Sequence, residues 1–189
     1  MSIKAALSLP YAKFVCNKIA KWSSNPIATQ EKVFNDLITQ AKNTVFGQDH
    51  NFNTISDYES FKKNVPVKDY EGLKPYVEKI KARQENILWP GLPTYFSKTS
   101  GTTSGAKYIP NTKASLKEQI KAAKSAILCY VNETKKTDFV NGKMIFLQGS
   151  PVLDNTLKVP TGRLSGIVAL HVPSYLQKNR LPSYDTNCI

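Results

Sequence analysis

A run of small hydroxylated residues and glycines is the part of this chain best suited to bind an anion. The segment "TSGTTSGAK" covers residues 99–107; five of its nine residues carry hydroxyls, two are glycines and the last is a lysine. Glycine allows successive backbone N–H groups to point into one concavity, and hydroxyl and ammonium groups add donors for a phosphate. Clusters of Ser, Thr and Gly are also typical of ordinary solvated turns. The residues alone therefore leave two interpretations, a phosphate-binding loop and a turn.

The spacing excludes two widespread phosphate-binding motifs. In the P-loop of nucleoside triphosphatases, four residues separate the first glycine from a Gly-Lys-Ser/Thr triplet. Counted from Gly101, that triplet would have to begin at Ala106. The dinucleotide-binding motif G-x-G-x-x-G would need a glycine in place of Thr103. The segment matches neither motif.

A third phosphate loop does fit. Ser-Gly-Thr-Thr followed closely by Gly and Lys resembles the phosphate loop of adenylate-forming enzymes, and three longer segments narrow the resemblance. They are "ILWPGLPTYFSKTSGTTSGAKYIPNT" (residues 87–112), "MIFLQGSP" (144–151) and "TGRLSGIVALHVPSYLQKNRLPSYDTNCI" (161–189). Together they resemble the auxin-responsive acyl-acid amido synthetase family, and the compact, lysine-rich chain is similar to its bacterial branch.

This resemblance implies an ATP-dependent ligase that uses Mg²⁺. Such an enzyme activates a carboxylic acid as an acyl-adenylate and transfers the acyl group to an amino acid. A relative that passes the acyl group to coenzyme A would use the same loop, so that acceptor stays an alternative. The resemblance assigns the ATP phosphates to Ser100, Gly101, Thr102, Thr103, Ser104, Gly105 and Lys107. It assigns no catalytic, acyl-binding or metal-ligating residue within this chain.

Within this loop, Thr103 and Ser104 are expected to supply the hydroxyl contacts. The reach of the Lys107 ammonium group depends on how the loop closes.

The chain is strongly basic, with 26 Lys and Arg against 14 Asp and Glu and a net charge of +12. Such a balance can indicate a polyanion partner. Only Arg83, Arg163 and Arg180 could make bidentate contacts to phosphates or bases, and the lysines are spread along the chain. We interpret the charge as a solvated surface and expect no nucleic-acid partner. A non-catalytic basic module that binds a polyanion is the alternative function.

The cysteines and histidines indicate no redox or metal chemistry. Cys16, Cys129 and Cys188 are widely spaced and lack a C-x-x-C pair, so we expect isolated thiols in a reducing cytoplasm. His50 and His171 are expected to be structural. No apolar run approaches the ~20 residues that a membrane-spanning helix needs, so no membrane partner is expected.

The first part of the chain is predicted to be mainly helical. Apolar residues at helical spacing predict a helix over residues 29–47, capped by Thr29. Ser56 and Glu59 have capping-box spacing and predict a short helix. A third helix is expected over residues 69–83, with Pro75 in its first turn or at a kink.

The second part alternates strands with a helix. Strands are predicted at 94–99, 107–109, 144–147 and 166–172, with a helix opened by Ser115 and Glu118 and buried through Leu116, Ile120 and Ile127. The order of strand, helix and strand predicts an α/β fold in which the helical N-terminal region packs on part of a sheet.

The family resemblance also gives an expected domain organisation. Residues 1–189 would be the N-terminal part of the large domain of an adenylate-forming enzyme, mainly helical over about 1–90 and α/β over about 94–189. The small C-terminal domain would be absent. We therefore expect a fragment of a longer enzyme that is inactive alone and self-associates through uncovered apolar surface.

Overall fold

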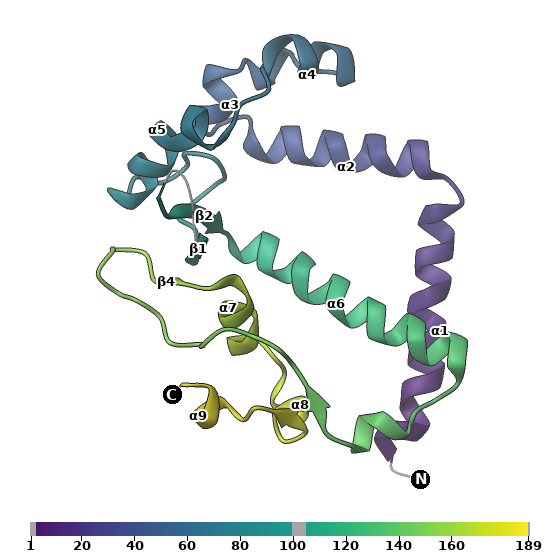
Figure 1. The fold of residues 1–189 in the computed structure, drawn as a ribbon. Coiled ribbons are helices and arrows are strands. Elements are labelled where there is room, and N and C mark those ends of the chain that lie inside the picture. Colours follow the sequence, from purple (N-terminus) through teal and green to yellow (C-terminus); the bar gives the residue numbers. More distant parts are fainter. Residues whose placement is uncertain (1–2, 100–104, 189) are drawn as a thin grey trace. The chain divides into compact units, whose positions relative to one another are not determined.

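The computed structural model describes residues 3–99 and 105–188, which form a mixed fold of helices and short strands, as predicted (Figure 1). The helices are α1 (Ile3–Ser23), α2 (Pro26–Ala41), α3 (Val45–Asp49), α4 (Tyr58–Asn64), α5 (Tyr70–Lys81), α6 (Lys113–Thr134), α7 (Leu164–Leu170), α8 (Ser174–Gln177) and α9 (Tyr184–Asn187), with 3₁₀ turns η1 (Phe52–Thr54) and η2 (Asp138–Asn141). The strands are β1 (Tyr95–Thr99), β2 (Lys107–Asn111), β3 (Met144–Ile145), β4 (Thr161–Gly162) and β5 (Arg180–Leu181).

The chain divides into two compact units. The hairpin unit comprises Ile27–Lys113 and Leu153–Thr161. The α1–α6 unit comprises Met1–Pro26, Ala114–Val152 and Gly162–Ile189. Each unit therefore combines segments that are distant in the sequence.

An antiparallel hairpin of β1 and β2 forms the sheet of the hairpin unit. Its register runs from Tyr95 opposite Asn111 to Thr99 opposite Lys107. The Phe96 amide donates to the Pro160 carbonyl at 2.9 Å, which places β4 on the other side of β1. Helix α5 lies beside β2 (Figure 1). The two predicted strands at 94–99 and 107–109 are confirmed, and the second continues to Asn111.

One buried cluster of the hairpin unit lies between α5 and this sheet, and a second is formed by Ile38, Ala41, Phe52 and Ile55. Helical spacing puts Tyr76, Val77 and Ile80 of α5 on one face, which is buried. They pack with Phe96, which has no exposed surface. Ile87 and Val159 complete the buried cluster. Burial of this apolar surface fixes the hairpin against α5.

The helix predicted over residues 29–47 is two helices. α2 begins at Pro26, because proline suits the first helical position, and it ends at Ala41. Thr44 then caps α3 by accepting a hydrogen bond from the Gly47 amide at 3.0 Å. A Cβ on Gly47 would lie 2.2 Å from the Ala41 carbonyl oxygen, so this close approach requires glycine. The predicted cap at Thr29 is therefore wrong.

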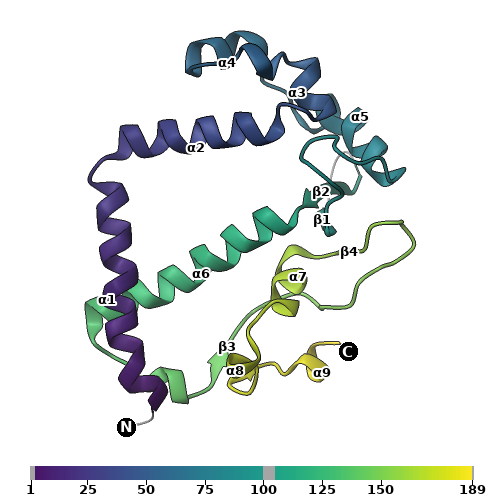
Figure 2. The ribbon, with the colours of Figure 1, turned by 180° about the vertical axis from the view of Figure 1, so that it is seen from behind.

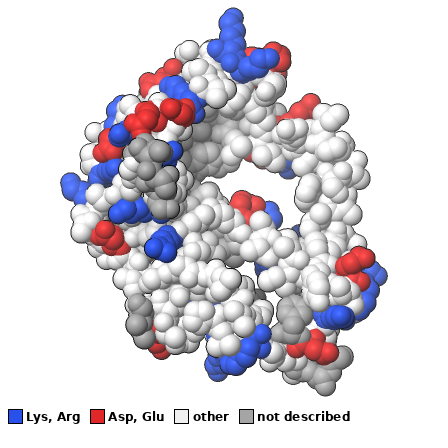
Figure 3. Space-filling view, in the orientation of Figure 1, with Lys and Arg blue, Asp and Glu red and all other residues white. Residues whose placement is uncertain are grey.

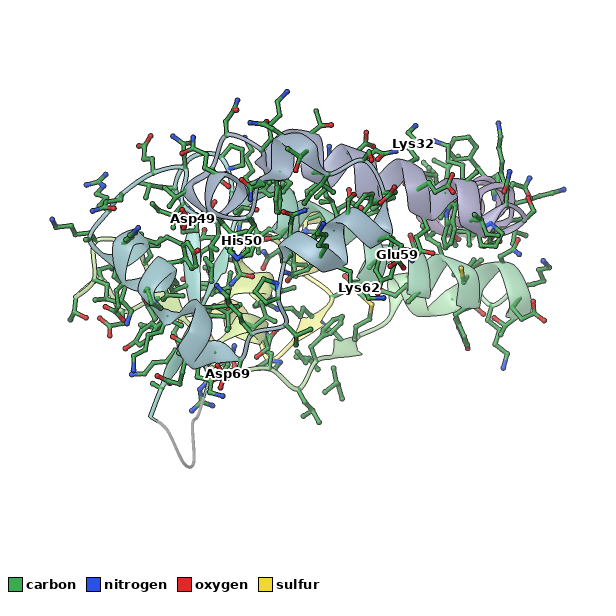
Figure 4. All side chains as sticks on the ribbon, turned by 90° about the horizontal axis from the view of Figure 1, so that it is seen from above. Lys32, Asp49, His50, Glu59, Lys62 and Asp69 are labelled. Carbon is green, nitrogen blue, oxygen red and sulfur yellow. The ribbon has the colours of Figure 1, made fainter. Side chains whose placement is uncertain are left out.

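The short helix α4 exists as predicted, but its cap is shifted by one residue. Asp57 Oδ1 accepts from the Ser60 amide at 2.7 Å, and Ser60 Oγ accepts from the Asp57 amide at 3.1 Å. A carboxylate is a strong acceptor for the free N–H groups of a first turn, so Asp57 takes the cap in place of Ser56. Glu59 instead pairs with Lys62 at 3.4 Å (Figure 4).

The third predicted helix is confirmed as α5. Asp69 caps it by accepting from the Gly72 amide at 2.9 Å, and Pro75 lies inside it.

In the α1–α6 unit, α1 crosses α6 (Figure 2). The contact is made by Ala12 of α1 with Leu128 and Val131 of α6, all buried. The predicted buried face of α6 is correct at Leu116 and wrong at Ile127, which is exposed. One residue corresponds to a rotation of about 100° around a helix, so burial of Leu128 turns Ile127 towards solvent. The helix also begins at Lys113, before the predicted cap at Ser115.

Two predicted strands are wrong in extent or type. Only Met144 and Ile145 of residues 144–147 form a strand, β3, which pairs in parallel with β5. Ile145 and Leu147 are 74% and 99% exposed, so this segment is not covered on both sides. Residues 166–172 contribute to helix α7, since an apolar run alone does not distinguish a buried strand from a buried helix. A Cβ on Gly166 would lie 2.1 Å from the Ser150 carbonyl oxygen, and this tertiary contact requires glycine.

A hydrogen bond connects α5 to α3 in the hairpin unit. Tyr76 Oη donates to Asp49 Oδ2 at 2.8 Å, and the Tyr76 ring meets the Phe46 ring edge-on at 5.3 Å. The neighbouring His50 is buried, with Nδ1 2.9 Å from the Phe46 carbonyl oxygen (Figure 4). His50 is therefore structural, as predicted. Burial, followed by the bond to Asp49, raises the pKa of Tyr76 to about 12.

This shift predicts a pH dependence of stability. An unfolded tyrosine has a pKa of about 10. Because the folded pKa is raised, the stabilising contribution is fully present below about pH 10 and is lost as the pH rises through about 12. We expect Tyr76→Phe to have a free energy of unfolding about 1 kcal/mol lower than that of wild type at pH 8. At pH 11.5 the difference between the two proteins should be smaller. Urea unfolding at the two pH values measures this difference.

The exposed Tyr58 provides the matched control. Tyr58→Phe should leave the free energy of unfolding unchanged at both pH values. An equal deficit of Tyr76→Phe at pH 8 and pH 11.5 would contradict the assignment.

Candidate phosphate-binding site

The β1–β2 hairpin holds both ends of the segment predicted to bind phosphate. Its last cross-strand pair joins Thr99 to Lys107, and opposite residues of an antiparallel pair have Cα atoms about 4.5–5.5 Å apart. The predicted contacts Ser100, Gly101, Thr102, Thr103 and Ser104 lie outside the described residues. The structure thus places Gly105 and Lys107 at the end of a hairpin, where a connecting segment is held at both sides.

Gly105 has a backbone conformation that favours glycine. Its φ is +80°, in the left-handed region. Among the described residues other than its chain neighbours, no heavy atom lies within 4 Å of the position that a Cβ would take. Glycine is therefore favoured at this position by the backbone conformation.

Lys107 carries a positive charge beside the loop. Its Nζ lies 5.7 Å from the centroid of the Tyr70 ring, and Tyr70 Oη accepts a hydrogen bond from the Tyr108 amide at 2.8 Å. Within residues 3–99 and 105–188, no carboxylate lies within ion-pair distance of Lys107. No carboxylate of the described residues therefore pairs with this ammonium group, and the Tyr70 ring makes a cation–π contact with it.

A second lysine strengthens the attachment of β2 to α5. Lys81 Nζ lies 4.0 Å above the Tyr108 ring and 2.7 Å from Glu78 Oε1. Its charge is thus compensated, whereas the described residues offer no carboxylate partner to Lys107. Lysines and carboxylates are interspersed over the part of the hairpin unit around α5 (Figure 3). Lys81 therefore has a structural role in holding β2.

The third lysine near the hairpin has a carboxylate neighbour. A hydrogen bond from the Thr156 amide lowers the pKa of Asp154, and the charge of Lys98 contributes to the same shift. Asp154 is itself fixed by backbone hydrogen bonds to Thr161 at 2.7 and 2.8 Å. Lys98 therefore has a carboxylate in its electrostatic surroundings.

A buried polar contact fixes the register at the other end of the hairpin. Asn111 Nδ2 donates to Ser97 Oγ at 2.7 Å and to the Ile109 carbonyl at 3.0 Å. Buried polar groups that are satisfied in only one register specify that register. Sequence reasoning found neither this pair nor the role of Tyr70, because no motif marks them.

The described residues contain no group of three or more His, Cys, Asp or Glu side chains that could hold a metal ion. Mg²⁺ is commonly bound through substrate phosphates with only one or two carboxylates, so a Mg²⁺ that arrives with ATP is compatible with this hairpin. Across the same described residues, no helix has the length and apolar character needed to cross a membrane.

Comparison with known proteins identifies the class. The family model described as the GH3 family N-terminal domain matches residues 15–183, and the chain belongs to this family. It is similar to indole-3-acetic acid-amido synthetase GH3.2 of Arabidopsis thaliana, with 32% identity over 95 residues, 50% of this chain and 17% of that protein. It is also 31% identical over 86 residues to 4-substituted benzoates-glutamate ligase GH3.12 of the same plant, 45% of this chain and 15% of that protein.

A solved structure supports the fold. The chain superposes on AtGH3.15 acyl acid amido synthetase in complex with 2,4-DB with a TM-score of 0.76 and 21% identity. The match covers 94% of this chain and 31% of the other. The predicted family and mixed fold are thus confirmed, and the chain spans less than a third of the length of the proteins that it matches.

Proposed function

We propose that the protein containing this chain is an ATP-dependent ligase that activates a carboxylic acid as an acyl-adenylate and joins the acyl group to an amino acid. The observation that carries the proposal is the family match over residues 15–183, since similar family members are named amido synthetases. The β1–β2 hairpin would supply the phosphate site. Gly105 supports this role through its left-handed backbone conformation, and Lys107 through a charge for which the described residues supply no ion-pair partner.

The chemistry requires a group that stabilises departing pyrophosphate. The acid carboxylate forms a bond to the α-phosphorus of ATP while the bond from that phosphorus to the β-phosphate oxygen breaks. Negative charge grows on the leaving pyrophosphate, and the amides and hydroxyls of residues 100–105, with Lys107, would hold it. Mg²⁺, when bound with ATP, neutralises part of the phosphate charge. The amino acid amine then attacks the acyl carbonyl, and AMP leaves.

The substrate class follows from the names of similar family members. These proteins are named for indole-3-acetic acid and for 4-substituted benzoates with glutamate. We propose an aromatic carboxylic acid as the substrate of the present protein and an amino acid as the acceptor.

Acid-dependent release of pyrophosphate tests this function. With the complete gene product, ATP and Mg²⁺, we expect pyrophosphate release to rise by orders of magnitude when a suitable aryl or alkyl acid is added. Addition of amino acids should then yield an acyl amide, identified by mass spectrometry. Absence of acid-dependent release across a broad panel, from well-folded protein, would refute the ligase assignment. A thioester formed with coenzyme A in place of an amide would refute the proposed acceptor.

A further inference from the structure

Two cysteines that are distant in the sequence meet where α1 crosses α6. The Sγ atoms of Cys16 on α1 and Cys129 on α6 lie 3.5 Å apart. Both are free thiols, and both are partly buried. The prediction of isolated thiols is therefore wrong for this pair. Only tertiary packing brings the two sulfur atoms together.

The packing around the pair fixes this approach. Ala12 lies one helical turn before Cys16 and is fully buried, and its small side chain allows α6 to come close. On α6, Leu128 and Val131 flank Cys129 and are buried against α1. A further contact holds the same crossing, in which Lys124 Nζ lies 4.8 Å from the centroid of the Tyr11 ring. Helix α1 and all of α6 after Lys113 belong to one compact unit.

We propose that Cys16 and Cys129 form a reversible intramolecular disulfide when the protein meets an oxidant of the disulfide class, such as glutathione disulfide. A disulfide has an S–S length of about 2.05 Å, so the sulfur atoms need to approach by roughly 1.5 Å. The site is a modification site on the scaffold and does not depend on the proposed ligase activity.

The reaction balances through thiol–disulfide exchange. One cysteine thiolate attacks glutathione disulfide, which forms a mixed disulfide and releases one glutathione. The second cysteine attacks the protein sulfur of the mixed disulfide and releases the second glutathione. Two protein thiols are oxidised by two electrons, one glutathione disulfide is reduced, and two protons pass to the two glutathione thiols.

The surroundings of Cys16 set the expected rate. Burial, and then the hydrogen bond that Cys16 donates to Cys129, raises the pKa of Cys16 above its ordinary value. Because the thiolate is the attacking species, reaction at neutral pH should be slower than at an ordinary exposed thiol. Proximity then favours closure once a mixed disulfide has formed at either cysteine, since the second thiol is already in place.

The test uses the chain with its three cysteines in redox buffers of glutathione and glutathione disulfide. After oxidation, we expect one alkylatable thiol, at Cys188, and a proteolytic product in which the Cys16 and Cys129 peptides are joined. Reduction by excess glutathione should restore all three thiols. The oxidised chain should melt about 5 °C or more above the reduced one, because a long loop is closed.

Matched variants separate this pair from other thiol reactions. Cys16→Ser and Cys129→Ser should each keep the circular dichroism spectrum, lose the linked product and retain a mixed disulfide with glutathione at the remaining partner. Cys188→Ser should behave as wild type in linkage. The proposal is overturned if the native chain forms only mixed disulfides, links through Cys188, or links between molecules on a non-reducing gel. It is also overturned if chain unfolded in urea gives the same yield of linked product as folded chain.

Discussion

Replacement of Thr103 and Ser104 by alanine is expected to remove most of the turnover of the proposed ligase while leaving its folding intact. Each hydroxyl that donates to a growing negative charge on pyrophosphate contributes about 10²- to 10³-fold to the rate in comparable sites. Losses within one cradle are not additive, so the double variant should lose at least about 10²-fold in kcat/KM. Acid-dependent pyrophosphate release measures this loss, and thermal unfolding checks the fold.

The control for this experiment is a pair of hydroxyl residues on the surface of the same unit. Thr54 and Ser56 are exposed, so Thr54→Ala combined with Ser56→Ala should leave turnover unchanged. If the loop is an ordinary solvated turn, the Thr103 and Ser104 variant will match this control, and the phosphate-binding interpretation fails. The structure supports the test through the hairpin that holds both ends of the segment.

Removal of the Phe96 ring is expected to be the most damaging core substitution in the hairpin unit. Phe96 has no exposed surface, packs in the buried cluster with α5 residues and meets the Tyr108 ring edge-on at 6.0 Å. Phe96→Ala leaves a cavity and should cost about 3–5 kcal/mol of unfolding free energy. The same change loosens β1, the strand that leads into the predicted phosphate loop.

Tryptophan fluorescence can follow this unit separately. Trp89 packs against a buried cluster of the hairpin unit, whereas Trp22 lies on α1. In a Trp22→Phe background, urea unfolding monitored through Trp89 should shift strongly for Phe96→Ala. The control is Ile109→Ala, because Ile109 lies on the paired strand and is exposed. Its free energy of unfolding should differ from that of wild type by no more than about 0.5 kcal/mol. Equal shifts for the two variants would show that Phe96 is not a central core residue.

Much of the hairpin unit follows from local sequence signals. Asp69 and the apolar spacing of α5 define a capped amphipathic helix. After residue 93 the hydrophobic pattern no longer has a helical period, and this change marks the two strands. The small residues between those strands cannot fill a core, and most of them lie outside the described residues. Gly105 and Lys107 were predicted as site residues and lie at the end of the hairpin. Phosphate contacts at residues 100–105 and at Lys107 remain a prediction, as does the similarity to the bacterial branch of the family.

The partners of the site residues were not predictable from local pattern. Tyr70 reaches the Tyr108 amide across 38 positions of sequence, and the buried Ser97–Asn111 pair depends on strand register. These contacts involve single polar groups with no characteristic spacing. Their positions are set only when helix and sheet have packed together.

What the sequence by itself determined is the family and the mixed fold, because motif spacing and hydrophobic period are local properties. Only the tertiary structure decided that residues 166–172 contribute to a helix, since the close approach of Gly166 to the Ser150 carbonyl oxygen depends on a distant segment. It also decided which face of α6 is buried and that Cys16 meets Cys129. If a helix turns about its axis by the angle of one residue, different side chains face the neighbouring element, but the hydrophobic period of the sequence stays the same. The sequence pattern therefore does not determine such contacts, which are set when the elements pack.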